Sequence, residues 1–180
     1  MDRSTLLHQL ECYTSDYSEE LLFKIQFIEL LQHPDSFQRT HLPGHITGSA
    51  WIVDASKKSA LLIHHAKLNR WLQPGGHADG DENVLRVALR EAEEETGVKE
   101  YKIISDTIFD LDIHTIPNRK DFPEHLHYDI RYLVQAKTED ELILSDESFN
   151  VAWIKFDELS SVTNNNPSIN RMVEKVKRLL

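Results

Sequence analysis

Three glutamates in one short stretch of this 180-residue chain have the spacing of a metal site. Glu91, Glu94 and Glu95 belong to a predicted helix that runs from about Glu82 to Thr96. At about 100° per residue they fall on one arc of that helix. The arc borders an apolar stripe, which consists of Leu85, Ala88, Leu89 and Ala92. Because Mg²⁺ and similar hard cations prefer carboxylate and carbonyl oxygens, the arc predicts a Mg²⁺ or Mn²⁺ site.

A glycine-rich loop directly precedes this helix, since residues 74–80 are Pro-Gly-Gly-His-Ala-Asp-Gly. Such a loop can bring backbone carbonyl and N–H groups close to a ligand. The competing interpretation is a solvated acidic helix face that binds nothing and whose like charges repel by roughly 0.2–0.5 kcal/mol per pair. We favour the metal site because the glutamates border the apolar stripe and follow the loop.

Loop and helix together resemble the Nudix box, G-x5-E-x7-R-E-U-x-E-E-x-G-U, in which U is an apolar aliphatic residue. Gly76 is followed by five residues and Glu82, and then by seven residues and the segment 90–98, Arg-Glu-Ala-Glu-Glu-Glu-Thr-Gly-Val. Every fixed position agrees, and only Ala92 is smaller than the usual aliphatic residue. The chain therefore resembles the Nudix hydrolase family (MutT-like) through residues 76–98.

This resemblance implies both a fold and an activity. The fold is of the α/β class, a mixed β-sheet between helices, with residues 1–42 as a helical extension and residues 43–180 as the Nudix domain. The activity is metal-dependent hydrolysis of the phosphoanhydride bond in a nucleoside diphosphate linked to another moiety, with Mg²⁺ or Mn²⁺ as the cofactor. Residues 46–53, 60–63 and 71–74 look like the family's strands before the box, and residues 151–159 look like its closing strand and following helix.

The resemblance also assigns metal-binding roles to individual residues of the box. Glu91, Glu94 and Glu95 correspond to the metal ligands, and the carbonyl of Gly75 is a further ligand. Glu82 supports the metal site from the start of the helix, directly or through water.

Catalytic roles carry over in the same way. Arg90 orients a helix carboxylate through a charge-assisted hydrogen bond. A glutamate takes the proton of the attacking water, and in this family that base lies on the helix or on a loop. Glu94 is our first choice for the base, and Glu147, just before the closing strand, is our second.

Two further groups of polar residues alternate along predicted strands near 107–114 and 126–136. Period-2 spacing puts the members of each group on one strand face. The groups are Asp110, Asp112 and His114, and His125, His127 and Asp129. Three interpretations of these two groups remain open: they line the substrate pocket, they hold an extra metal ion, or they form an ordinary polar sheet face. His64, His65 and His77 flank the glycine-rich loop and are either phosphate contacts or surface histidines.

The remaining elements are predicted from periodicity and turn residues. The first forty residues predict helices, and the second of these carries an apolar stripe over residues 21–31 that packs on the domain or on a second subunit. A homodimer is therefore one expectation. Additional strands are expected near 101–104 and 151–156, and a last helix from about Ser168 to Leu180.

Composition and charge restrict the partners. Thirty acidic and twenty basic residues give a formal net charge of −10. Such a surface repels nucleic acid and anionic lipid, so we expect neither nucleic acid nor membrane as a partner, and an anionic small molecule needs a bound divalent cation. No apolar run approaches the roughly 18 residues of a membrane span. Residues 1–20 lack a signal peptide, and the single cysteine, Cys12, predicts a cytoplasmic location.

Three function classes compete on this framework. The leading hypothesis is a hydrolase acting on a nucleotide sugar, a dinucleotide or a nucleoside triphosphate. An isomerase of the isopentenyl diphosphate type resembles a modified Nudix protein but uses an active-site cysteine, and Cys12 lies far from the box. A nucleotide-sensing module without turnover is the alternative, although such proteins commonly lack box glutamates that this chain retains.

Overall fold

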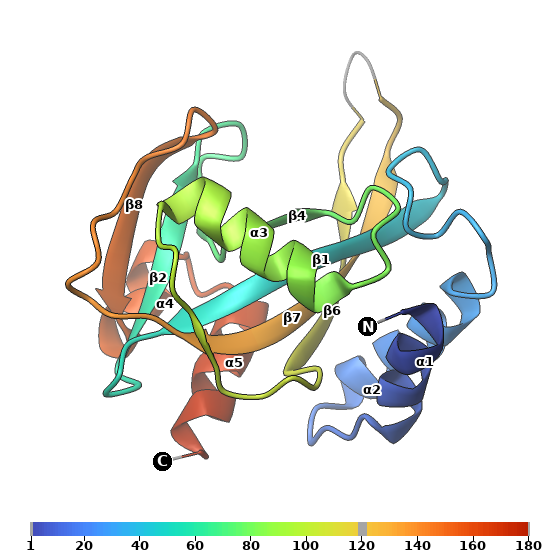
Figure 1. Ribbon diagram of the computed structural model, residues 1–180, viewed down its shortest axis with the longest axis horizontal. Coiled ribbons are helices and arrows are strands. Elements are labelled where there is room, and N and C mark those ends of the chain that lie inside the picture. The colour runs from blue at the N-terminus through green and yellow to red at the C-terminus, as the bar shows by residue number, and fades with distance from the viewer. Residues whose placement is uncertain (1, 119–121, 180) are drawn as a thin grey trace. The chain divides into compact units, whose positions relative to one another are not determined.

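The computed structural model describes residues 2–118 and 122–179, with helices and strands in the order seen in Figure 1. The helices are α1 (Arg3–Cys12), α2 (Ser18–Leu30), α3 (Val84–Thr96), α4 (Phe156–Val162) and α5 (Pro167–Lys177). The strands are β1 (Gly44–Val53), β2 (Ser59–His65), β3 (Arg70–Leu72), β4 (Gly75–His77), β5 (Lys102–Ile103), β6 (Asp110–Ile116), β7 (His125–Gln135) and β8 (Ser148–Lys155). Among the described residues, no helix has the length and apolar character needed to span a bilayer.

Hydrogen-bonded neighbours give the strand order β3-β2-β1-β7-β5, with β4 on β1, β6 on β7 and β8 on β2. The chain forms two compact units. Unit 1 consists of Met1–Ser49, Gly76–Ala88 and Asp106–Tyr132, and unit 2 of Ala50–Gly75, Leu89–Ser105 and Leu133–Leu180. The division falls inside β1, β4, β7 and α3. The predicted division at residue 42 stays a prediction, and Leu180, where the last helix was expected to end, lies outside the described residues.

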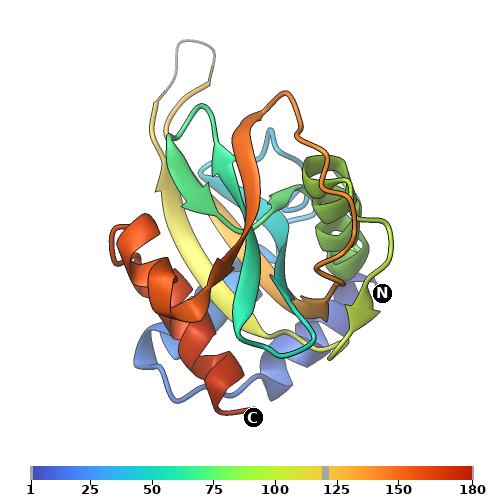
Figure 2. The same cartoon turned by 90° about the vertical axis from the view of Figure 1, so that its left-hand side faces the viewer.

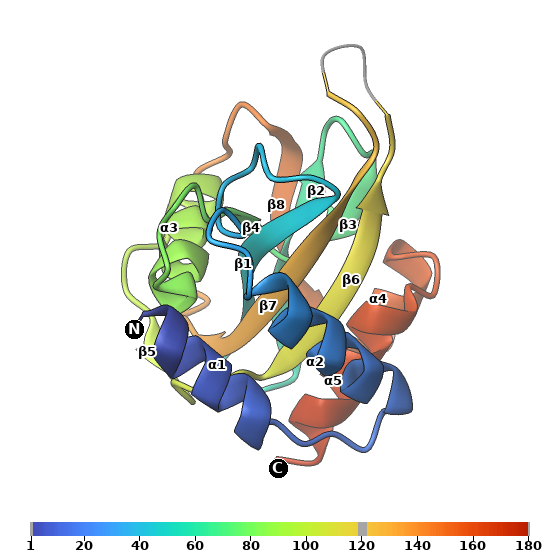
Figure 3. The same cartoon turned by 90° about the vertical axis from the view of Figure 1, so that its right-hand side faces the viewer.

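In unit 1, the two N-terminal helices pack on each other, and α2 packs on β6 (Figure 3). The ring of Phe27 meets that of Tyr128 edge-on, with 5.3 Å between their centroids. β6 pairs antiparallel with β7, which places Asp112 opposite Asp129 and His114 opposite His127. The two polar groups predicted on these strands are therefore cross-strand neighbours.

The first half of the predicted apolar stripe of α2 is exposed in this chain, so its packing on a second subunit stays a prediction. Leu22 and Ile25 are 62% and 63% exposed, whereas Phe27 is fully buried. The reason is a buried charge at the start of the helix. Glu20 accepts hydrogen bonds from the hydroxyl of Tyr13 at 2.6 Å and from the backbone N–H of Leu111 at 3.0 Å. These bonds turn the face that carries Glu20 toward β6.

In unit 2, β2 pairs antiparallel with β1, β3 and β8. Figure 2 shows β8 running beside β2, and Leu61 lies opposite Trp153 in that pair. After β8, α4 packs against α5. The side chain of Asn166 caps α5 by accepting from the backbone N–H of Ser168 at 3.0 Å, and Pro167 follows in the first turn, where its missing N–H costs nothing.

The glycine-rich segment and α3 differ in detail from the prediction. Gly75–His77 form the short strand β4 instead of a loop, because the flanking backbone bonds to β1: Ala50 N–H donates to the carbonyl of Pro74 at 3.0 Å. α3 begins after Asn83, whose side chain accepts from the N–H of Arg86 at 3.2 Å. Gly97, with a φ of 77°, ends the helix as predicted.

Candidate active site

Small residues let α3 approach β1 closely within unit 1. A Cβ on Gly48 would lie 2.8 Å from Cγ1 of Val84, so only glycine fits there. On α3 itself, Ala88 and Ala92 are buried as predicted. The predicted stripe members Leu85 and Leu89 are only half-buried, and the buried face continues along the helix to Glu95 and Thr96. One glutamate of the box therefore belongs to the buried face.

Glu95 is a buried carboxylate in acidic surroundings. Its side chain accepts a hydrogen bond from the backbone N–H of Gly75, with 2.9 Å between N and Oε2, and the residue is only 8% exposed. Burial is the main cause that raises the pKa of Glu95 to about 8; the Gly75 N–H opposes this shift, and the charges of Glu91, Glu147 and Glu94 contribute to it. These four carboxyl groups thus interact electrostatically in the structure.

Arg90 links two of these carboxylates on α3. Its Nη1 lies 2.8 Å from Oε1 of Glu91 and 3.4 Å from Oε2 of Glu94. Glu91 is well covered, with 16% of its side chain exposed, whereas the Glu94 side chain is 57% exposed. Arg90 therefore holds a covered carboxylate and an accessible one next to each other, and its role in orienting them for catalysis stays a prediction.

Glu147 lies outside the helix, at the start of β8. Its Oε1 is 3.3 Å from Nζ of Lys67, and its backbone carbonyl accepts from the N–H of Ala66 at 2.9 Å. Both side chains of the ion pair are more than half exposed, so the pair is weak and can exchange. Glu147 is therefore accessible as a proton acceptor.

Glu82 is held by the N-terminal helix in unit 1. Arg3 donates to Oε2 of Glu82 from its backbone N–H at 3.0 Å and to Oε1 from its Nε at 3.1 Å. The same guanidinium group donates to the carbonyls of Leu31, His33 and Pro34. The residue that was expected to support the metal site is thus oriented by a segment outside the box.

An aromatic group lies on β2, β3 and β8 of unit 2. The ring of His64 stacks on that of Trp71, with centroids 5.1 Å apart and planes 12° apart. Phe149, which is 62% exposed, meets His64 edge-on at 5.6 Å. Exposed aromatic rings of this kind can stack on a nucleobase.

The aspartates on β6 and β7 form an ion network instead of a metal site. Arg131 donates to Asp110 at 3.1 Å, to Asp112 at 3.0 Å and to Asp129 at 2.8 Å, and all four residues are buried or nearly so. Burial disfavours the charged form of Arg131, but the three carboxylates outweigh it and raise the pKa of the guanidinium group. Arg131 was missed at the sequence level.

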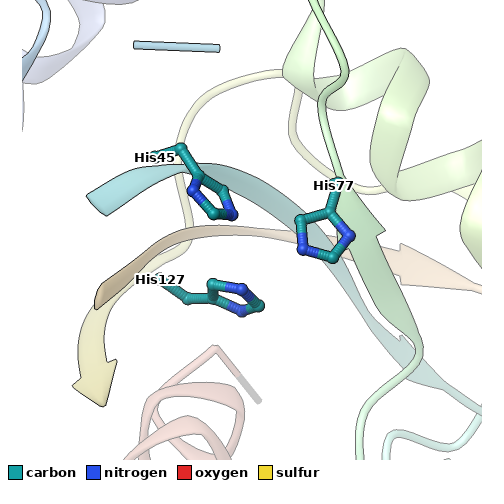
Figure 4. Close-up of side chains that lie close together, drawn as sticks. All are labelled: His45, His77 and His127. Carbon is teal, nitrogen blue, oxygen red and sulfur yellow. The ribbon is translucent and has the colours of Figure 1, made fainter. Parts of the chain in front are cut away.

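Three histidines of unit 1 converge from three different strands: His45 from β1, His77 from β4 and His127 from β7 (Figure 4). Each offers one ring nitrogen, and these nitrogens all lie within 4.8 Å of one another. His45 was not among the predicted residues. A signal for it existed, because His45, Thr47 and Ser49 alternate along β1, and both hydroxyl groups donate to Asp129.

The family follows from comparison with known proteins. The family model of the NUDIX domain matches residues 44–176, about three quarters of the chain. The chain belongs to the Nudix family.

Two curated relatives of this Nudix protein carry functional names. One, named "Probable DHNTP pyrophosphohydrolase", from Lactococcus lactis subsp. cremoris, is 28% identical over 138 residues, which cover 75% of this chain and 80% of the relative. The other, named "Bis(5'-nucleosyl)-tetraphosphatase [asymmetrical]", from Rattus norvegicus, is 35% identical over 108 residues, which cover 59% of this chain and 70% of the relative.

Solved structures agree on the fold. A Caenorhabditis elegans Ap4A hydrolase in a binary complex superposes with a TM-score of 0.60 at 18% identity and covers 74% of this chain and 96% of that one. A NUDIX family hydrolase from Clostridium perfringens superposes with a TM-score of 0.57 at 25% identity, over 76% and 98% of the two chains. The predicted family, the α/β Nudix fold and the class of enzyme, a Nudix pyrophosphohydrolase, are confirmed. The roles assigned to single residues stay predictions.

Proposed function

We propose that this Nudix protein is a metal-dependent hydrolase that cleaves the phosphoanhydride bond of a nucleoside diphosphate linked to another moiety. The observation that carries this proposal is the environment of Glu95, a carboxyl group whose pKa is raised chiefly by its burial and also by the charges of three further carboxyl groups. Ionised carboxylates that are partly shielded from water and repel one another are unfavourable unless a cation neutralises them. A divalent cation would remove that penalty.

The donor set fits Mg²⁺ or Mn²⁺. Glu91, Glu94 and Glu95 offer hard carboxylate oxygens, and the carbonyl of Gly75 lies in the same peptide segment whose N–H already bonds Glu95. The supporting role of Glu82 stays a prediction. When bound, the cation neutralises the diphosphate and lowers the pKa of the attacking water.

The remaining chemistry belongs to side chains of this chain. Arg90 fixes the rotamers of Glu91 and Glu94, so that the metal-binding and proton-accepting oxygens are positioned before the substrate arrives. Glu94 accepts the proton of the attacking water, since its side chain is the more accessible of the two. Glu147 is the second candidate for this role, because it is accessible and interacts electrostatically with Glu95.

The names of the relatives suggest which substrates to test first. Bis(5'-nucleosyl) tetraphosphates and dihydroneopterin triphosphate both contain phosphoanhydride bonds next to a heterocycle, and these compounds appear in the names of the relatives and structural neighbours. The exposed ring of Phe149 and the stacked pair His64–Trp71 offer aromatic surface for such a heterocycle. We place dinucleoside polyphosphates and pterin triphosphates ahead of nucleotide sugars.

The test is a substrate panel with Mg²⁺ or Mn²⁺, in which products are identified by mass. The panel contains dinucleoside polyphosphates, dihydroneopterin triphosphate, nucleoside triphosphates and nucleotide sugars, and each assay is repeated with Glu94→Gln. Turnover of one class that is lost without metal and in the variant supports the proposal. Tight nucleotide binding with no turnover of any member would instead identify a nucleotide sensor.

A further inference from the structure

The three-histidine cluster of unit 1 is separate from the predicted ligand set of the Nudix box. His45, His77 and His127 come from β1, β4 and β7, and their rings point toward one another in Figure 4. One nitrogen from each ring lies within 4.8 Å of the other two. Because strands β1 and β7 belong to the sheet, the rings are positioned by regular backbone.

His45 presents a buried nitrogen that lacks a hydrogen bond. The residue is fully buried, and its Nδ1 lies 3.3 Å from the carbonyl oxygen of His41. A carbonyl only accepts, so the neutral ring carries its proton on Nδ1 and its lone pair on Nε2. That Nε2 is buried, and no hydrogen-bond partner for it occurs among the residues that the structure describes. Coordination to a metal ion would satisfy it.

The rings are in the form that binds metals. Burial lowers the pKa of His77 to about 4 and that of His127 to about 2, and it also lowers the pKa of His45. Neutral imidazole is the ligating species. Arg39 and Asp79, two charged side chains that act on the pKa of His45 and His77, form an ion pair with each other, with Nε and Oδ1 2.6 Å apart.

We propose that His45, His77 and His127 form a binding site for a transition-metal ion of the Zn²⁺ class. Imidazole nitrogen suits Zn²⁺, Co²⁺, Ni²⁺ and Cu²⁺, whereas Mg²⁺ prefers oxygen. Zn²⁺ binds nitrogen at ~2.0–2.1 Å in tetrahedral geometry, so its ligands lie roughly 3.3–3.4 Å apart. The three nitrogens, which lie within 4.8 Å of one another, would move closer together on binding the ion.

His125 is placed to complete the coordination. Its Nε2 lies 3.3 Å from Nε2 of His127, which is close to the spacing of two ligands on one tetrahedral ion. Its Nδ1 lies 2.8 Å from the carbonyl of Pro123, so the lone pair of its neutral ring is on Nε2. The fourth position is therefore filled by His125 or by water, and the three-histidine set stands without it.

The experiment uses Co²⁺ alone as the probe, since a four-coordinate Co²⁺ site absorbs strongly in the visible range. The full chain is freed of metal with a chelator, placed in excess Mg²⁺ to saturate oxygen ligands, and titrated with Co²⁺. We expect one Co²⁺ per chain with a tetrahedral spectrum, displaced by Zn²⁺. His77→Ala and His127→Ala should each weaken Co²⁺ binding by at least about 10–100-fold, the loss that removal of an outer hydrogen-bond partner alone can cause.

Two matched variants separate this site from the box glutamates. His64→Ala removes a histidine that stacks on Trp71 outside the cluster, and Glu91→Gln removes a box carboxylate. Both should bind Co²⁺ like the wild type. Circular dichroism checks that each variant is folded. If an alanine variant does not fold, the glutamine variant at the same position replaces it. Absence of Co²⁺ binding in excess Mg²⁺, wild-type affinity in the His77 and His127 variants, or loss of Co²⁺ in Glu91→Gln would each overturn the proposal. None of these results depends on turnover.

Discussion

Glu94 is the residue on which the proposed chemistry depends most directly. Its carboxylate is exposed, and Arg90 approaches it to 3.4 Å. Glu94→Gln keeps the size of the side chain but cannot accept a proton, so turnover should fall by about 10²–10⁴-fold, the usual contribution of a general base. The measurement is kcat at saturating Mg²⁺.

The control for this change lies on the same helix. Glu93 is exposed next to Glu94 but is not a fixed position of the box. Glu93→Gln should leave kcat within about twofold, because surface changes of this kind rarely disturb structure. Equal kcat in the Glu94 and wild-type proteins would move the base to Glu147, to be tested by Glu147→Gln.

Glu95 makes a second prediction, for the metal-free protein. Its pKa is about 8 in the folded chain, against an ordinary value of 4.5, because the side chain is buried near other carboxylates. Between these two pH values the folded state binds more protons than the unfolded state. Stability therefore decreases as pH rises through this window. Glu95→Gln removes this titratable group. In the presence of a chelator, the midpoint of thermal unfolding should therefore fall less from pH 5 to pH 8 in the variant than in the wild type.

The same substitution should raise the Mg²⁺ concentration needed for half-maximal activity, since a ligand is lost. Glu93→Gln again serves as the control for both readouts. An unchanged Mg²⁺ requirement together with an unchanged pH slope would show that Glu95 is neither a ligand nor a strained carboxylate.

At the scale of elements, β6 and β7 are joined by a buried charge network. Arg131 is 2% exposed and neutralises Asp110 and Asp129, which are equally inaccessible. Arg131→Met removes the positive charge that these buried carboxylates face, which should lower the free energy of unfolding by about 3–5 kcal/mol. For a chain of this size the midpoint of thermal unfolding should fall by roughly 10 °C.

Arg86→Met is the matched control for this network. Arg86 pairs with Asp81 at the surface, with 67% of its own side chain exposed. An exposed pair contributes about 0–1 kcal/mol, so this variant should unfold almost like the wild type. A similar loss in both variants would mean that the buried network contributes no more than a surface ion pair.

The elements also show what the sequence can and cannot predict. α3, β1, β2 and β7 follow from periodicity and turn residues, and the Nudix box identifies the glutamate arc because its spacing is local. The sequence does not predict that Glu20 lies on the buried face of α2, because its hydrogen-bond partners Tyr13 and Leu111 come from other segments. β4 was expected as a loop because its pairing depends on β1 and not on its own glycines.

Contacts between distant segments account for what sequence reasoning missed in the sites. Arg131 lies two residues from Asp129, yet its role needs the β6–β7 register, which local sequence does not determine. Likewise, His45 and His127 meet only when β1 and β7 lie in one sheet. The alternation of polar residues predicts which face of each strand is polar. It does not predict which of these faces lie next to one another.

At the scale of the whole molecule, the net charge and the shifted pKa values of two groups determine how the protein responds to ions and to pH. The net charge of −10 repels an anionic substrate, which is one reason why a bound cation is proposed for this protein. Two buried groups also respond to pH in opposite directions: Glu95, in unit 2, resists deprotonation, whereas His77, in unit 1, resists protonation. The metal-free protein should therefore lose stability at both ends of the range.

The acid side of this behaviour can be tested through His77. Burial lowers its pKa from 6.5 to about 4, and Arg39, His45 and His125 act in the same direction, while Asp79 opposes them. Between pH 6.5 and about 4 the unfolded chain binds a proton that the folded chain excludes, so stability falls as pH falls. In chelator, His77→Gln should lose less stability than the wild type from pH 7 to pH 4.5. His33→Gln, at an exposed histidine, should behave as the wild type does. Parallel losses in all three proteins would show that the folded chain tolerates a charge on His77, and the low pKa would then be wrong.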